Sequence, residues 1–159
     1  MSKKWRTSVT VASIIEKDNK YLLIEEQTRD GILINQPSGH LEPNESPLQA
    51  SIRETKEETS FEFIPQHFLG VYLCQAVSQK DLSNVTYVRL AFSGYVSKFY
   101  NEPLDEGIIC THWLSYEQIL DNQAKLRTPL VLQCINDYRA KKLHSLDSIY
   151  SHESVWQVL

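Results

Sequence analysis

The segment spanning residues 46–59 constrains the fold most, because it carries strong helix signals and yet has only a weak apolar face. Ser46 is a good N-cap, Pro47 suits the first helical position, and Gln49 completes a capping box with Ser46. A weak apolar stripe favours a narrow contact with a sheet. The sequence therefore predicts a helix over 46–59 that packs on a sheet.

One face of this helix carries three carboxylates. Glu54, Glu57 and Glu58 stand at positions i, i+3 and i+4, so they share a face and repel one another. Lys56 points away from Glu57 by about 100°, and Arg53 pairs with Glu57 at most, so two charges remain. A hard divalent cation removes this repulsion, and magnesium takes carboxylate and phosphate oxygens. The pattern indicates phosphate chemistry at a magnesium site.

Five runs of β-branched and apolar residues predict strands around this helix. They cover 7–16, 20–26, 68–78, 85–97 and 108–114. The polar turn between the first two runs predicts a hairpin, and the polar stretch 79–84 joins the third to the fourth.

Two more helices are predicted in the C-terminal third of the chain. Thr128 and Pro129 supply a cap and a first position for a helix over 129–142, whose apolar residues recur at helical spacing. A short helix is expected at 116–121. Strands before, between and after helices give a mixed α/β fold rather than a doubly wound parallel sheet.

The composition excludes several classes of protein. With 159 residues, 42% of them hydrophobic, one domain over 1–159 is expected. A net charge of −4 argues against a nucleic-acid binder, and no apolar run is long enough for a membrane span. Cys74, Cys110 and Cys134 are interpreted as buried reduced thiols of a cytoplasmic protein, and no zinc site is expected because ligands at short spacing are missing.

The charge is unevenly distributed. Residues 42–58 hold five acids and two bases, a net of −3, whereas 125–142 hold five bases and one acid, a net of +4. An acidic segment and a basic segment suit a metal on one side and an anion on the other. The alternative is that both are ordinary solvated faces.

The spacing resembles the Nudix box. From Gly39 the chain reads GHLEPNESPLQASIRETKEETSF, which places Glu45, Arg53-Glu54, Lys56 and Glu57-Glu58 at the box positions over 39–61. The resemblance implies a Nudix-type α/β/α sandwich with a mixed, largely antiparallel central sheet. Two positions depart from the family pattern.

Neither departure touches a carboxylate of the box. Thr55 replaces an aliphatic residue, a small change in packing. Ser60 replaces the glycine that ends the helix in a left-handed conformation, which costs a non-glycine residue about 1 kcal/mol. We therefore do not infer a loss of activity.

Three short stretches, one of which runs into the start of the box, resemble the NudJ phosphatases, a bacterial Nudix subgroup. They are Asn35–Glu42, Pro65–Phe68 and Leu126–Leu130. This resemblance implies a hydrolase of nucleoside tri- and diphosphates and of thiamine-related pyrophosphates such as hydroxymethylpyrimidine pyrophosphate. Members of the subgroup tend to release orthophosphate rather than pyrophosphate.

The Nudix resemblance also assigns roles to the box residues. Glu54, Glu57 and Glu58, with the Gly39 carbonyl, would hold Mg²⁺, with Mn²⁺ as an alternative. Glu57 is a candidate general base, although the family also uses residues on later loops. Arg53 would hold a box glutamate in position, with Glu45 as its partner.

Candidate substrate contacts lie outside the box. Arg89 lies within a predicted strand, where it is either an edge residue facing water or a phosphate clamp. Gln36 and Asn35 could bind a base or phosphate or shape a turn, and Arg127 is a candidate anion contact or a solvated helix start. His40 is expected to make a structural hydrogen bond. Trp113 is interpreted as a core residue rather than a platform for a substrate ring.

Three functions remain open at this level. The first is a magnesium-dependent phosphatase, and the second is a pyrophosphohydrolase that releases pyrophosphate and a nucleoside monophosphate. The third is a binding module without chemistry, which the intact carboxylates and Arg53 argue against. The expected partner is a small-molecule substrate, with no nucleic acid or membrane, and the chain is expected to be a monomer or a homodimer.

Overall fold

Seven strands and three α-helices lie in the part of the chain that the structure, a computed structural model, describes: residues 5–77 and 83–157. The strands are β1 (Arg6–Lys17), β2 (Lys20–Thr28), β3 (Gly31–Asn35), β4 (Ser38–His40), β5 (Phe61–Val77), β6 (Asn84–Phe99) and β7 (Ile108–Ser115). The helices are α1 (Pro47–Thr59), α2 (Tyr116–Asp121) and α3 (Pro129–Arg139). Short 3-10 turns lie at Gln123–Lys125, Leu146–Ser148 and Glu153–Trp156.

The sheet is mixed and largely antiparallel, as predicted. Its main path runs β3-β2-β1-β6-β5, with β4 paired to β1 and β7 paired to β2, and only β1 and β6 are parallel. The β1–β2 hairpin is confirmed, but only two residue pairs join its strands, next to the turn. Beyond this turn β1 pairs with β4 and β6 while β2 pairs with β3 and β7, so the sheet divides into two halves.

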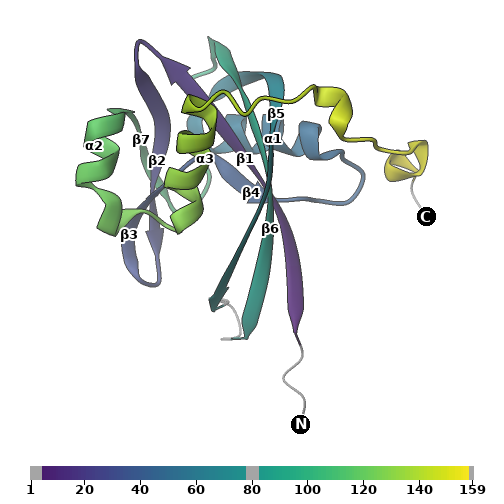
Figure 1. Cartoon of the computed structure of the whole chain (residues 1–159), viewed down its shortest axis with the longest axis horizontal. Coiled ribbons are helices and arrows are strands. Elements are labelled where there is room, and N and C mark those ends of the chain that lie inside the picture. Colours follow the sequence, from purple (N-terminus) through teal and green to yellow (C-terminus); the bar gives the residue numbers. More distant parts are fainter. Residues whose placement is uncertain (1–4, 78–82, 158–159) are drawn as a thin grey trace.

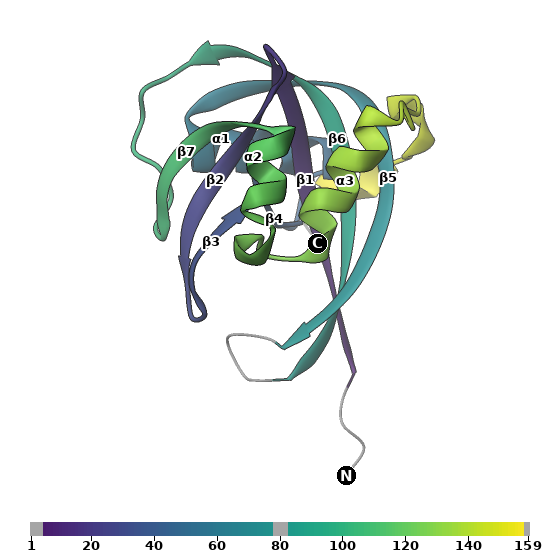
Figure 2. The same ribbon diagram turned by 60° about the vertical axis from the view of Figure 1, so that its left-hand side comes forward.

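Helices cover both faces of the sheet, which gives the α/β/α sandwich (Figures 1 and 2). One buried cluster joins α2 and α3 to the sheet through residues such as Ile14, Ile119 and Ile135. A second joins α1 to the opposite face through residues such as Val11, Ala50 and Phe92. Side chains that alternate along β1 supply both clusters, because successive residues of a strand point to opposite faces.

Helix α1 has the caps that the sequence predicts. Ser46 and Gln49 form the capping box, and Ser60 ends the helix at φ 60° and ψ 16°. The strain of this left-handed serine is offset because its Oγ accepts a hydrogen bond from the Glu102 N–H at 2.7 Å. The buried face of α1 is polar, and Thr55 Oγ lies 2.8 Å from Ser13 Oγ and 2.8 Å from the Ser51 carbonyl. The threonine therefore fits a polar contact with β1 that an aliphatic side chain could not make.

Some boundaries differ from the predictions. Helix α3 ends at Arg139, three residues early, and the chain turns at Lys141 with φ 59°. Strand β5 begins at Phe61 rather than at residue 68, and β3 and β4 were not predicted. Residue 78 and the connection over 79–82 lie outside the described residues.

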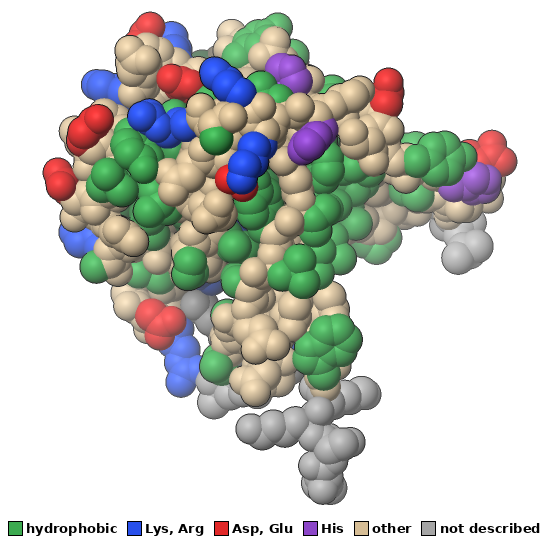
Figure 3. Space-filling model, viewed as in Figure 1, with side chains coloured by type: hydrophobic (Ala, Val, Ile, Leu, Met, Phe, Trp, Pro, Cys, Tyr) green, Lys and Arg blue, Asp and Glu red, His purple; other side chains and the backbone are tan. Residues whose placement is uncertain are grey.

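The basic end of α3 is a solvated face. Lys142 pairs with Asp137 at 2.8 Å, and the Arg139 guanidinium lies over the Tyr116 ring. Figure 3 shows Lys and Arg side chains interspersed with acidic ones around α2 and α3. Of the basic segment, Arg127 belongs instead to a cavity described below.

The structure also bears on the expectations for Trp113 and for the three cysteines. Trp113 packs against the cluster under α1, as predicted. The interpretation of the cysteines is right for Cys134, which is buried, and wrong for Cys74 and Cys110, which are partly exposed. The C-terminal residues fold back, and Trp156 donates a hydrogen bond to Gln49. In the described part of the chain no helix has the length and apolarity to cross a membrane.

Candidate active site

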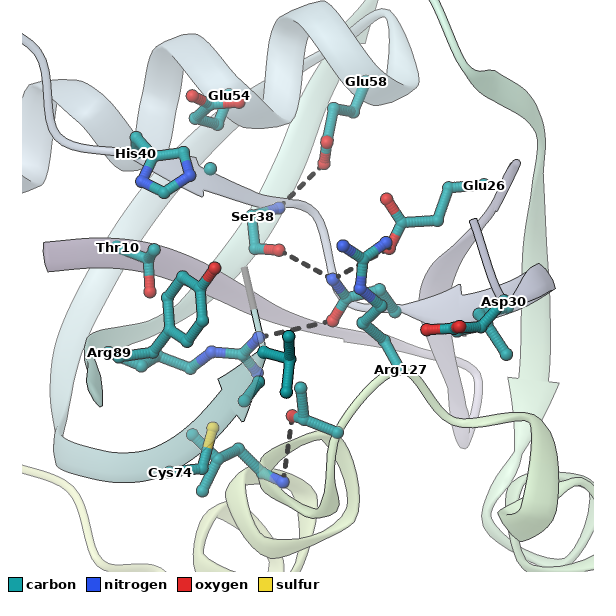
Figure 4. A pocket seen from close by; sticks show the side chains of 18 of the residues that line it. Thr10, Glu26, Asp30, Ser38, His40, Glu54, Glu58, Cys74, Arg89 and Arg127 are labelled. Carbon is teal, nitrogen blue, oxygen red and sulfur yellow. Dashed lines mark hydrogen bonds and ion pairs between the residues drawn. The ribbon is translucent and has the colours of Figure 1, made fainter. Parts of the chain in front are cut away.

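A cavity of about 740 Å³ opens between the two halves of the sheet. It is lined by residues of β1 to β6, by two carboxylates of α1 and by the start of α3. Figure 4 shows Glu54 and Glu58 on the α1 side of Ser38, and Arg89 and Arg127 on the other side. Acidic and basic groups thus face one cavity from opposite sides.

Glu58 is placed by the backbone of β4. Its Oε2 accepts a hydrogen bond from the Ser38 N–H at 2.8 Å, and the residue is 8% exposed. Glu54 is equally buried and lines the same wall. Because α1 presents both on one face, their carboxylates meet the short strand β4 side by side.

Gly39 forms a cradle for Glu54. A Cβ at position 39 would lie 2.0 Å from the Glu54 Cδ, far inside van der Waals contact. The absence of a side chain therefore lets the carboxylate lie against the β4 backbone at Gly39. This contact gives a physical reason for the glycine that begins the box.

Arg53 holds the acidic residues in position. It donates to both carboxylate oxygens of Glu45, at 2.9 Å and 2.7 Å, to Glu54 at 2.7 Å and to Glu57 at 3.0 Å. It also donates to the His40 carbonyl at 3.0 Å, which ties α1 to β4. The hydrogen bond from Arg53 lowers the pKa of Glu45, and the one to Glu45 raises the pKa of Arg53.

The positive charge near Glu54 and Glu58 is too small to balance their two carboxylates. Burial, together with the charges of Glu54, Glu26 and Asp105, raises the pKa of Glu58 to about 9, against the hydrogen bond from the Ser38 N–H, which lowers it. Burial also raises the pKa of Glu54, against the hydrogen bond from Arg53. Two carboxylates that face one cavity fit a hard divalent cation. The residues present therefore suit the metal that the sequence predicts.

Glu57 is more exposed than the other two carboxylates, although it shares Arg53 Nη1 with Glu54. Its side chain is 39% exposed and contacts Arg53, and it is not among the residues that line the cavity. The i+3 position places it on the solvent side of the carboxylate face. The structure thus brings Glu54, Glu58 and Gly39 together, with Glu57 at the rim.

Arg89 is buried, so its interpretation as an edge residue facing water is wrong. Strand β6 lies between β1 and β5, and Arg89 is only 5% exposed. Its guanidinium donates to Gln36 Oε1 at 2.8 Å and to Asn35 Oδ1 at 3.4 Å, and it lines the cavity. A buried guanidinium that has neutral partners is available for an anion.

Gln36 is not among the residues that line the cavity, and its predicted contact with substrate stays a prediction. It is 1% exposed, and its amide donates to the Val131 carbonyl at 2.7 Å while accepting from Arg89. It therefore links α3 to Arg89 and positions the guanidinium.

Arg127 reaches the cavity from the turn before α3. Its Nη1 lies 3.1 Å from Glu26 Oε1, and its backbone N–H donates to the Ile34 carbonyl at 2.8 Å. Glu26 also accepts from Asn35 at 3.3 Å, so the arginine is held by β2 and β3. His40 lines the cavity too and makes the expected hydrogen bond, with Ser8 at 2.9 Å.

The sequence analysis did not identify three residues at or near the site, which are Glu26, Tyr87 and Asp105. Glu26 and Tyr87 line the cavity, and the backbone N–H of Asp105 donates to the Glu57 carbonyl at 3.0 Å. The alternation of side chains along β2 and β6 was the available signal for the first two. Asp105 lies in a loop with no such pattern.

Comparison with known proteins identifies the family. The family model of the NUDIX domain matches residues 4–133. The chain belongs to the Nudix hydrolase family. This Nudix hydrolase is therefore an enzyme, and its fold is the one that the box implies.

Relatives of known name are similar over most of this Nudix hydrolase. Phosphatase NudJ of Escherichia coli (strain K12) is 33% identical over 146 residues, which cover 91% of this chain and 92% of that protein. Phosphatase NudJ of Shigella flexneri gives the same figures. A NUDIX hydrolase structure from Nitrosomonas europaea has a TM-score of 0.84 at 45% identity, covering 92% of this chain and 98% of that one.

More distant structures share the fold alone. A MutT protein from Methanosarcina mazei Go1 has a TM-score of 0.70 at 22% identity, with 89% of this chain and 99% of that one covered. The 33% identity to the NudJ phosphatases, over most of both chains, makes this protein a NudJ-like phosphatase homologue within the Nudix family.

Proposed function

We propose that this NudJ-like enzyme is a magnesium-dependent phosphatase. Its substrates would be nucleoside tri- and diphosphates and thiamine-related pyrophosphates such as hydroxymethylpyrimidine pyrophosphate, from which it releases orthophosphate. The observation that carries the proposal is the single cavity that holds Glu54 and Glu58 opposite Arg89 and Arg127. Carboxylates suit a cation that binds phosphate, and arginines suit the phosphate itself.

The carboxylate side would hold the metal. Glu54, Glu57, Glu58 and the Gly39 carbonyl are the proposed ligands of Mg²⁺, or of Mn²⁺ in its place. When bound, the cation neutralises charge that develops on the phosphate oxygens and lowers the pKa of a water. Arg53 keeps Glu54 and Glu57 aligned through the hydrogen bonds described above.

The reaction is an attack of water on the terminal phosphorus. A bond forms from the water oxygen to phosphorus, the bridging O–P bond breaks, and the electron pair of that bond leaves with the remaining phosphate group. The water loses a proton, for which Glu57 is our candidate base. Its carboxylate is 39% exposed and one oxygen is held by Arg53, so it is within reach of solvent.

The opposite side would hold the rest of the substrate. Arg89 offers a fixed, buried guanidinium, because Gln36 and Asn35 accept its hydrogen bonds. Arg127 offers a second, which must share its charge with Glu26 at 3.1 Å. Both arginines are candidates for the phosphate contact nearest the metal, and we do not assign that contact to one of them alone.

Phosphorus NMR of the products tests the proposal. The chain is incubated with GTP and, separately, with hydroxymethylpyrimidine pyrophosphate, with and without Mg²⁺. Orthophosphate that appears only with metal is the expected result. Pyrophosphate and GMP would instead favour the pyrophosphohydrolase and overturn the subgroup assignment, and turnover without added metal would overturn the metal dependence.

A pair of matched variants ties the reaction to the cavity. Glu58→Gln keeps the volume of the side chain and removes its charge, so it should abolish metal-dependent release of orthophosphate. Glu153→Gln makes the same change at an exposed carboxylate that does not line the cavity, and should turn over like the native chain. Equal activity of the two variants would refute the ligand assignment.

Two further expectations stay predictions. We place the enzyme in the cytoplasm because its three cysteines are free. Its state as a monomer or a homodimer is a matter for size-exclusion chromatography with light scattering.

A further inference from the structure

A second group of ligand-type side chains lies outside the active-site cavity. Glu25 on β2 pairs directly with Cys110 on β7, and His112 follows two residues later on the same strand. Directly opposed residues, and residues two apart on a strand, point to the same face. None of these three residues lines the cavity.

The donor atoms of the three residues converge on one point. The His112 Nε2 lies 3.3 Å from the Cys110 Sγ and 3.2 Å from the Glu25 Oε1. The Cys110 Sγ lies 3.7 Å from the Glu25 Oε2. One ligand atom from each residue falls within 4.8 Å of the other two.

The distance between sulfur and nitrogen, and the reach of the carboxylate to both, suit a tetrahedral zinc site. Zinc binds sulfur at about 2.3 Å and nitrogen or carboxylate oxygen at about 2.0–2.2 Å, so tetrahedral angles put sulfur about 3.6 Å from the other ligands and nitrogen about 3.4 Å from oxygen. The separation of 3.3 Å between the Cys110 Sγ and the His112 Nε2 agrees with the first edge to within about 0.3 Å. The Glu25 carboxylate turns Oε1 toward the nitrogen, at 3.2 Å, and Oε2 toward the sulfur, at 3.7 Å. Two strands held by the sheet therefore present the ligands in position.

The arrangement does not suit a cysteine nucleophile. A catalytic relay needs the base to face the nucleophile with one ring nitrogen and the orienting carboxylate with the other. Here the same nitrogen of His112 faces both Cys110 and Glu25. Convergence on one nitrogen is the geometry of shared coordination.

We propose that Glu25, Cys110 and His112 bind a divalent cation of the zinc class. A thiolate and an imidazole favour zinc over magnesium, and the two negative charges of thiolate and carboxylate balance the charge of the ion. Glu25 and His112 are 31% and 38% exposed, so water completes the fourth position. Since β7 pairs only with β2 among the described strands, the ion ties this edge strand to its neighbour.

Cobalt(II) is the probe, because it replaces zinc and reports on sulfur. The reduced, metal-free chain is titrated with Co²⁺, and the near-ultraviolet band of thiolate-to-cobalt charge transfer is measured. We expect the band to saturate with one ion per chain and to be displaced by Zn²⁺ but not by Mg²⁺. The proposed catalytic ligands are all oxygen, so cobalt bound there gives no such band.

Variants assign the band to the site. Cys110→Ser should remove it, and His112→Gln should weaken cobalt binding by at least about tenfold. Cys74→Ser is the matched control, because Cys74 is the other partly exposed cysteine and lines the active-site cavity.

The result that overturns the proposal is equally definite. A native chain without the band, a band that survives Cys110→Ser, or a band that is lost in Cys74→Ser would each refute it. Because His112 is also exposed, His112→Gln keeps the test valid if the serine variant fails to fold.

Discussion

Replacing Gly39 with alanine is expected to cut turnover about 100-fold while leaving the fold intact. The new Cβ would lie 2.0 Å from the Glu54 Cδ, and ordinary contact begins near 3.4 Å. The carboxyl group must therefore retreat by about 1.5 Å, which breaks its 2.7 Å hydrogen bond with Arg53. A displacement of about 1 Å in a catalytic group costs about 100-fold, or about 2.7 kcal/mol of transition-state stabilisation.

The assay is steady-state kinetics over a titration of Mg²⁺, with thermal unfolding measured in parallel. The variant should need more metal and have a lower kcat, with a Tm within a few degrees of the native value. Adding Glu54→Asp shortens the side chain by one methylene, so the double variant should recover part of the activity that Gly39→Ala loses. Native turnover in Gly39→Ala, or a double variant no more active than the single one, would refute the claim that Gly39 makes room for the Glu54 carboxylate.

Three further predictions follow from buried contacts. Arg89→Ala should lower kcat/KM by about 10- to 100-fold. Arg89→Lys should recover only part of this loss, because an ammonium cannot reproduce the two parallel hydrogen bonds of a guanidinium. Unchanged kinetics would refute the role of Arg89 in binding phosphate. Thr55→Val should lower the free energy of unfolding in urea by about 1 kcal/mol, and a Ser13→Ala change should restore it, because both partners are then apolar; additive losses would contradict this. Ser60→Ala should cost about 1 kcal/mol in the same assay, because it keeps the left-handed strain and loses the acceptor for the Glu102 N–H; an unchanged midpoint would show that this bond contributes nothing.

The local elements could be predicted well because their signals are short in sequence. The caps at Ser46 and Pro47 fixed the start of α1, and the structure places the helix there. Strands β3 and β4 were missed because they are only five and three residues long, too short for an alternating pattern to stand out. The end of α3 was misplaced because no glycine marks the left-handed turn at Lys141.

Some features of the site could likewise be predicted from the sequence, and others could not. The i, i+3, i+4 spacing placed Glu54, Glu57 and Glu58 on one helix face without knowledge of the sheet. Which of them reach the cavity depended on where β4 lies, since Ser38 binds Glu58 and leaves Glu57 at the rim. The expectation that no zinc ligands lie near one another considered spacing along the chain, and the β2–β7 pairing brings Glu25 within reach of Cys110 across 85 positions.

By itself, the sequence determined the carboxylate helix, its caps and the family, because these depend on residues within a few turns of one another. Only the tertiary structure decided that Arg89 is buried, that Gln36 supports it from 53 positions away, and that two strand halves enclose a cavity. The physical reason is that burial and ion pairing depend on which strands become neighbours. That choice is made by the packing of the whole sheet between its helices, and no local pattern encodes it.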